Sequence, residues 1–178
     1  RVFNWNVPMD DETHKYYCFI LTQDLENEIY EWHELIDYER KIDKIEIKYL
    51  KPEKWLGALY YEIIPLEKGK HSKYVVLGWD GNTKATTKKI IDVISFSKGG
   101  VKLGAPIFKT DKGTQKRHIL EYSSDVMVSL RWFKKEQRIV FDHLAPRESM
   151  MTGVYSYYGP DFTYESYNLK KGKFTLNH

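Results

Sequence analysis

Residues 73–96, KYVVLGWDGNTKATTKKIIDVISF, decide the fold class of this chain. Two apolar runs rich in β-branched residues, 74–79 and 90–96, flank a polar gap that opens with residues 80–82, DGN. An Asp-Gly pair between two such runs is a strong local signal for a β-hairpin, because Gly and Asn tolerate the positive φ of its turn. The β-branched content of residues 90–96 argues against the helix that their spacing would also allow. The stretch therefore predicts two antiparallel strands joined by a turn.

Strand-like runs and turn signals continue to alternate along the rest of the chain. Further β-branched and aromatic runs cover residues 101–108, 118–122, 126–133, 138–144 and 162–169. Turn signals separate them near residues 99–100, 112–113, 124, 135, 147 and 171–172. We therefore expect a mainly all-β fold, an antiparallel up-and-down meander of about ten or more short strands. It would close as a barrel, a sandwich or a few propeller-like blades, and we prefer a twisted meander or barrel-like sheet.

The first third of the chain is less regular. Residues 1–9 and 14–21 have the composition of strands, and Pro8 indicates an edge strand or a strand end. Residues 24–50 fit a helical stripe, but their last part also alternates like a strand, so both forms stay open. Residues 52–55, PEKW, predict one short helical turn with Pro at its first position.

Composition narrows the class of protein. The chain has 178 residues, 42% hydrophobic and 30% charged, which predicts a single β-rich globular domain spanning residues 1–178. Its one cysteine, Cys18, lies in an apolar run and is expected to be a small buried hydrophobe. No apolar run approaches the length of a membrane span. Because the chain begins at Arg1 and not at Met, we expect it to be a processed or C-terminal part of a longer chain.

Seven short stretches together resemble a family of uncharacterised proteins from bacteria of the Bacteroidetes group. They are NWNVPMDD, WLGALYYEIIP, YVVLGWDGN, KKIIDVISF, LGAPIF, IVFDHLAP and YYGPDFTY, and they span most of residues 3–165. The resemblance implies a β-rich meander that is exported to the periplasm or cell envelope. It implies no activity and transfers no catalytic residue to this chain.

Charge is distributed unevenly. Residues 1–72 have a net charge of −5 and residues 73–178 a net charge of +8. In an up-and-down meander the turns near residues 81, 112 and 135 would share one end, which predicts a basic surface for an anionic glycan or a lipid headgroup. Nucleic acid is disfavoured, because these turns lack interleaved aromatic residues. The alternative is that charged turn tips only keep the strand edges soluble.

The turns near residues 99, 124 and 147 would meet at the opposite end and bring Asp125 close to Asp142 and His143. A histidine beside carboxylates can act as a general base or bind a metal, so a hydrolase-type enzyme using Asp142, His143 and Asp161 is one alternative. Neighbouring residues on a strand point to opposite faces, however, so Asp142 and His143 would need a bulge to serve one site.

Aromatic residues make up 15% of the chain. They fit half-buried strands, or else a surface that stacks on ligands. At residues 79–82 we expect a turn with Trp79 in the core. The alternative is a sugar site in which Trp79 stacks and Asp80 and Asn82 bind hydroxyl groups. Residues 155–162, which include Tyr158 and Asp161, likewise predict a turn, and the alternative is again a sugar site.

The sequence therefore predicts a non-enzymatic, exported binding or structural module whose ligand is a glycan, a lipid headgroup or a protein partner. The alternatives are the hydrolase-type enzyme and a carbohydrate-binding module with exposed aromatic residues. No histidine spacing or carboxylate pattern indicates a metal, and no motif indicates a cofactor or a catalytic residue. The candidate binding residues are Trp79, Asp80, Asn82, Asp125, Asp142, His143, Tyr158 and Asp161.

Overall fold

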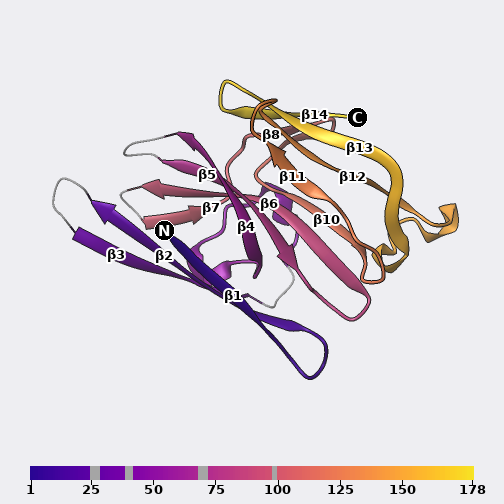
Figure 1. Cartoon of the computed structure of the whole chain (residues 1–178), viewed down its shortest axis with the longest axis horizontal. Helices are drawn as coiled ribbons and strands as arrows, with labels where there is room; N and C mark the ends of the chain where they lie inside the picture. The colour runs from indigo at the N-terminus through magenta and orange to yellow at the C-terminus, as the bar shows by residue number, and fades with distance from the viewer. Residues whose placement is uncertain (25–28, 39–41, 68–71, 98–99) are drawn as a thin grey trace.

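The computed structural model describes residues 1–24, 29–38, 42–67, 72–97 and 100–178. Within these ranges the chain forms three β-sheets (Figure 1). The first sheet consists of β1 (Val2–Pro8), β2 (His14–Asp24) and β3 (Ile29–Ile36). The central sheet consists of β4 (Leu59–Glu67), β5 (Lys73–Asp80), β6 (Thr86–Ser97), β7 (Gly100–Leu103) and β10 (His118–Ser123). The third sheet consists of β8 (Phe108–Thr110), β9 (Gly113–Gln115), β11 (Leu130–Phe133), β12 (Arg138–Pro146), β13 (Tyr158–Lys170) and β14 (Lys173–Asn177).

The central sheet is covered on both faces. On one face, side chains such as Leu77 and Ile91 pack against Phe141 and Tyr167 of the third sheet. On the other face, side chains of the central sheet pack against the first sheet and against the segment that precedes β4. This second core contains Tyr16, Cys18, Leu35, Trp55, Val76, Ile90 and Ile94. Two-sided burial explains why residues 74–79 and 90–94 are mostly apolar, since both faces of these parts of the strands lie away from water.

The mainly all-β prediction is confirmed, but the closed barrel is wrong. Strands β4, β5 and β6 form a meander, as do β1 to β3 and β11 to β14. Two pairings break the simple up-and-down order, because β10 pairs with β6 and β14 pairs in parallel with β8. The sheets stack like a sandwich because the central strands have two apolar faces, and a barrel wall would leave one of them in water.

Several predicted elements change their limits. Part of the ambiguous region 24–50 is the strand β3 and another part is a 3-10 turn, η1 (Ile45–Ile47), whereas residues 25–28 and 39–41 lie outside the described residues. The helical turn at residues 52–55 is confirmed as a 3-10 turn, η2 (Pro52–Lys54). The expected strand 101–108 is wrong, because Gly104, with φ of 88°, separates β7 from β8. Cys18 is fully buried as expected, and burial raises the pKa of its thiol to about 12.

Turns that the meander would separate meet in the structure. Ser124 Oγ donates a hydrogen bond of 2.6 Å to Lys84 O, so the turn near residue 124 lies beside the turn after β5. In the third sheet, the Leu169 N–H donates to Gln137 O, so the end of β13 lies beside the turn near residue 135. The C-terminal His178 contacts Asp111 of the turn near residue 112 and also Glu165, which precedes Leu169 in β13. The turns near residues 81 and 124, which the meander would place at opposite ends, are therefore neighbours. The expected turn near residue 99 falls partly outside the described residues.

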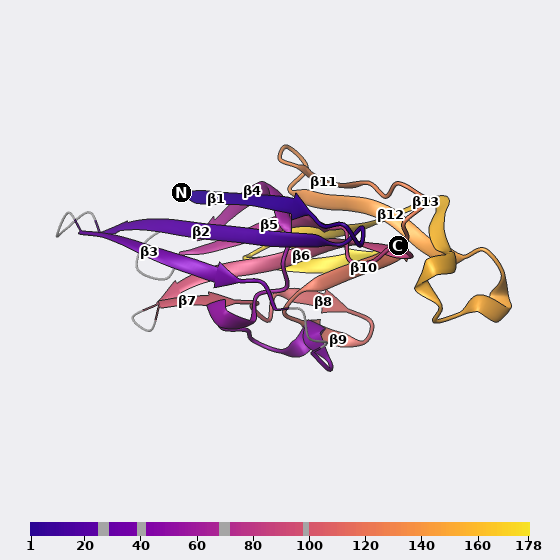
Figure 2. The same cartoon turned by 90° about the horizontal axis from the view of Figure 1, so that it is seen from below.

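The connection between β12 and β13 extends beyond the end of the sheets (Figure 2). It contains two further 3-10 turns, η3 (Ser149–Met151) and η4 (Tyr155–Tyr157). Within the described residues, no helix has the length and hydropathy needed to cross a membrane.

Candidate functional site

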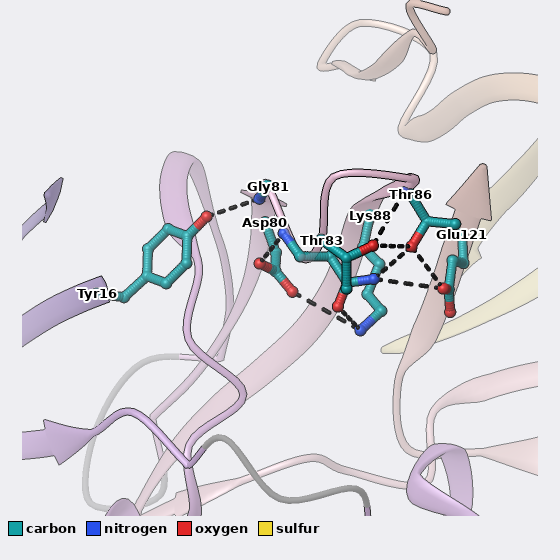
Figure 3. A network of polar contacts seen from close by, with 8 residues as sticks. Tyr16, Asp80, Gly81, Thr83, Thr86, Lys88 and Glu121 are labelled. Atoms are coloured by element: carbon teal, nitrogen blue, oxygen red, sulfur yellow. Dashed lines mark hydrogen bonds and ion pairs between the residues drawn. The ribbon is translucent and has the colours of Figure 1, made fainter. Parts of the chain in front are cut away.

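The turn after β5 is a closed polar network (Figure 3). Asp80 is 8% exposed, and its Oδ1 accepts a hydrogen bond of 2.7 Å from the Asn82 backbone N–H. The Asn82 side chain donates to Thr86 Oγ1 at 2.6 Å and accepts from Lys88 Nζ at 2.6 Å. Glu121 of β10 accepts from Thr86 Oγ1 at 2.9 Å and from the Asn82 amide at 3.3 Å. The groups that a sugar at this turn would need are therefore engaged within the protein.

The turn itself differs from the expected Asp-Gly hairpin. The connection covers residues 81–85, and Asn82 takes the left-handed conformation with φ of 49°. Gly81 is needed for a different reason, because a side chain there would overlap the ring of His14. Close approach of the first sheet, and not positive φ, accounts for a glycine at this position.

The same turn joins the first sheet to the central sheet. The Tyr16 hydroxyl accepts a hydrogen bond of 2.7 Å from the Gly81 N–H, and burial raises the pKa of Tyr16 well above its ordinary value. The ring of Trp79 is half-buried and meets the ring of His14 edge to face, with ring centres 5.1 Å apart. Trp79 therefore belongs to a packed joint between two sheets.

Asp80 is the titrating group of this joint. Burial raises the pKa of its carboxyl to about 6, although the Asn82 N–H and the Lys88 ammonium, 3.9 Å away, act in the opposite direction. A buried carboxylate loses hydration that two partners do not fully replace. Asp80 is therefore protonated in the folded protein in a pH range in which an unfolded chain would ionise it.

Asp80 is expected to contribute a fall in the free energy of unfolding between pH 4 and pH 7, whereas His118, whose pKa burial lowers to about 4, contributes a rise over much of the same range. The contribution of Asp80 is the difference between the wild type and Asp80→Asn. The folded pKa of Asp80 is raised, so its contribution is complete below pH 4 and is lost as the pH rises through about 6. The loss approaches about 3 kcal/mol. Asp80→Asn removes this slope, which urea unfolding at stepped pH values measures. The exposed Asp125→Asn is the matched control and keeps the slope. An unchanged slope in Asp80→Asn would contradict the prediction.

The second candidate cluster lies where β12 pairs with β13. The register of this pair shifts between Asp142 and Leu144, so His143 lies at an irregularity. His143 Nδ1 is 2.8 Å from Asp161 Oδ2, whereas Asp142 Oδ2 accepts a hydrogen bond of 2.7 Å from the Ser129 N–H. Asp142 and His143 therefore have separate partners even with the irregularity, and the histidine pairs with Asp161 instead.

Asp161 is held as a carboxylate. The Thr163 hydroxyl and backbone N–H both donate to its Oδ1, at 2.7 and 3.0 Å, and together with His143 they lower the pKa of Asp161 to about 2. A carboxylate next to an imidazole orients the ring and stabilises its protonated form, which is the supporting part of a general-base arrangement. Both side chains lie at the surface, at 40% and 35% exposure.

The remaining candidate residues have structural contacts. Asp125 is exposed in the turn that follows β10, beside the turn after β5. The Tyr158 hydroxyl accepts a hydrogen bond of 3.0 Å from the Gly153 N–H, and its ring packs on Tyr155 with ring centres 5.3 Å apart. Tyr158 therefore holds the segment between β12 and β13 in place. In the described part of the chain, no group of three His, Cys, Asp or Glu is arranged to hold a metal ion.

A surface that the sequence did not single out is the outer face of the first sheet. Rings from all three strands gather there, and Trp5 stacks on Tyr17 at 5.3 Å and on Phe19 at 5.8 Å. Phe3 lies 5.7 Å from Trp32, which is 61% exposed. We call the outward rings of Phe3, Trp5, Tyr17, Phe19, Tyr30 and Trp32 the aromatic face.

A signal for the aromatic face was present in the sequence. In residues 2–8, VFNWNVP, the large apolar side chains alternate with two asparagines. In residues 16–21, YYCFIL, both alternating sets are apolar, so this strand has a second apolar face besides the one in the core. Comparison of the chain with models of protein families, with curated proteins and with solved structures finds no match.

Proposed function

We propose that this chain is a non-enzymatic binding module and that it binds a carbohydrate on the aromatic face. The observation that carries the proposal is the exposure of these rings. Phe3, Trp5, Tyr30 and Trp32 are 44%, 45%, 58% and 61% exposed. Soluble monomers seldom expose contiguous apolar patches larger than a few hundred Å², and such patches mark interaction sites.

Ring chemistry favours a sugar over a purely apolar ligand. Tyr and Trp combine a wide apolar ring with one hydrogen-bonding group, so they can cover the C–H face of a sugar and still reach a hydroxyl. Charged side chains lie among the rings. Lys15 Nζ is 5.9 Å from the centre of the Tyr17 ring, and Glu34 lies opposite Phe19 in the strand register. The face thus offers both stacking surface and polar groups.

The proposal includes the exported location that the family resemblance implies, where glycans of the cell surface would be the accessible ligands. A test of location is independent of the binding test. Antibody detection of the native protein in fractions of its source cells would place it in the envelope or in the cytoplasm. Recovery only in the cytoplasm would contradict the exported location but not the binding site.

We expect Trp32→Ala to lower the affinity for a bound glycan about tenfold or more, because it removes a stacking ring. Calorimetry with soluble polysaccharides and their oligosaccharides measures the affinity. Phe162→Ala is the matched control, since Phe162 is 94% exposed on β13 of the third sheet. Absence of binding to every glycan, or equal loss in both variants, would contradict the proposal. A concentration-dependent dimer abolished by Trp32→Ala would assign the face to a second copy instead.

A second candidate, a hydrolase, is favoured by the pair of His143 and Asp161 alone. Their 2.8 Å contact gives the imidazole a fixed carboxylate partner. The same glycans test this alternative. After incubation with the protein, chromatography of the glycan would reveal cleavage products. Cleavage that is lost in both His143→Ala and Asp161→Asn, with binding retained, would favour the enzyme over the binding module.

A further inference from the structure

The first and central sheets are in contact along only part of their length. Near Tyr16 and Trp55 they share a closed core. Ile20 of β2 and Ile94 of β6, each 2% exposed, mark the end of this core. Beyond them the sheets enclose an open cleft of about 710 Å³, which has Ser72 at its rim. This volume lies in the range of small-molecule binding sites, roughly 300–1,000 Å³.

The walls of the cleft come from both sheets and combine apolar and polar side chains. Val2 and Ile20 line it on the first sheet, and Ile94 and Phe96 line it on the central sheet. Tyr74 meets Phe96 edge to face, with ring centres 6.0 Å apart, so the two rings form one wall. These side chains continue the packed core into a region that no side chain of the described residues fills. A ligand with an apolar body would remove their surface from water.

Most of the polar side chains of the cleft belong to the first sheet or precede it, and Ser72 lies on the side of the central sheet. His33 of β3 has its Nε2 3.1 Å from Thr22 Oγ1 and 3.8 Å from Glu31 Oε2, and its ring centre is 6.4 Å from that of Phe96. Arg1 also lines the cleft. The basic residues Arg1 and His33 and the carboxylate of Glu31 therefore lie beside the apolar side chains of the cleft. A sugar would need polar partners on every side of the cleft, whereas a ligand with one polar end would not.

We propose that this cleft binds a single-chain amphipathic carboxylic acid, chemically a fatty acid. The chain lies between Ile20, Ile94 and Phe96, and the carboxylate lies towards His33, Thr22 and Arg1. The site differs from the aromatic face, because none of the six rings that define that face lines the cleft. The binding of a fatty acid does not depend on the proposed carbohydrate binding.

Calorimetry with dodecanoate below its micelle concentration tests the proposal. We expect saturable binding to the wild type and a loss of affinity of at least about tenfold in Phe96→Glu, which places a charge on the apolar wall. Phe162→Glu is the matched control on the third sheet and is expected to bind normally. His33→Gln is expected to weaken dodecanoate severalfold and to leave dodecanol unchanged, because the alcohol has no carboxylate.

The result remains decisive if Phe96→Glu fails to fold. Hydrogen exchange of the wild type with and without dodecanoate would then show protection of residues 20–23, 31–33 and 94–96. Absence of binding, or binding that leaves these segments unprotected, would overturn the proposal. Equal binding of dodecanoate, dodecanol and dodecanoate methyl ester would overturn the assignment of the carboxylate to His33.

Discussion

Arg117→Met is expected to lower the free energy of unfolding by about 3–5 kcal/mol, because it leaves a buried carboxylate without its charge partner. Arg117 and Asp92 are 0% and 1% exposed, and Arg117 Nε lies 3.1 Å from Asp92 Oδ2. Arg117 Nη1 also donates to the carbonyl oxygens of Ile45 and Lys48. One guanidinium therefore neutralises a charge inside the protein and ties the η1 turn to the central sheet.

The loss should depend on pH. Burial raises the pKa of Asp92, and Arg117 opposes that effect. Without Arg117 the pKa of Asp92 rises further, so the variant regains stability as the pH falls and the carboxyl becomes neutral. Urea unfolding at pH 7 and pH 5 measures both effects. A destabilisation of less than about 1 kcal/mol at pH 7 would show that water or a rearranged side chain replaces the ion pair.

Two variants isolate the ion pair from other effects. Asp92→Leu combined with Arg117→Met removes both charges and is expected to be more stable than Arg117→Met alone. Lys116→Met is the neighbouring control. Lys116 donates to Ile47 O from a solvent-exposed position, so its replacement is expected to lower stability by at most about 1 kcal/mol. A double variant as unstable as the single one would assign the loss to packing of the Arg117 side chain.

Trp55→Ala is expected to lower the free energy of unfolding by about 3–5 kcal/mol and to loosen the first sheet selectively. Trp55 is fully buried, and its ring meets Tyr16 of β2 edge to face and packs on Tyr60 of β4. Its indole N–H donates a hydrogen bond of 2.7 Å to the Tyr60 hydroxyl. Its backbone carbonyl also accepts from the Tyr38 N–H, just beyond β3.

Hydrogen exchange with mass spectrometry distinguishes local from global effects. In Trp55→Ala, amides of β1 to β3 should lose more protection than amides of β12 and β13, because the residue joins only the first two sheets. Trp132→Ala is the matched control, since Trp132 packs on Phe174 in the other core. It should destabilise the protein without this selectivity. Uniform loss of protection in Trp55→Ala would mean that the three sheets unfold as one unit.

Local sequence pattern was enough to predict many strands and their faces. Residues 73–80 and 86–97 are antiparallel strands because β-branched side chains favour extended backbone and a polar loop separates them. The prediction for residues 126–133 was only partly right, because the strand begins at Leu130. Val128 and Leu130 are nevertheless buried, as their alternation predicts. Alternation thus predicts the buried face better than it predicts the limits of a strand.

The candidate site was harder to predict, because its residues come from distant parts of the chain. The sequence grouped Asp142, His143 and Asp161 in one candidate site, and the pairing of β12 with β13 brings Asp161 to the histidine. Asp142 instead accepts a hydrogen bond from the Ser129 N–H. Asp80 had the spacing of a turn residue, and its high pKa comes from its burial in the folded protein. Neither effect has a local signal, since each depends on contacts between segments far apart in sequence.

The sequence by itself determined the all-β class, the strand at residues 90–96, the turn after Asp80 and the burial of Cys18, because these follow from side-chain shape and alternation. Only the tertiary structure decided which strands pair across long distances, such as β14 with β8, and therefore which turns meet. It also decided that Arg117 and Asp92 are buried together and that the rings of the first sheet face outward. Long-range pairing depends on how whole apolar faces cover one another, and no short stretch of residues contains that information.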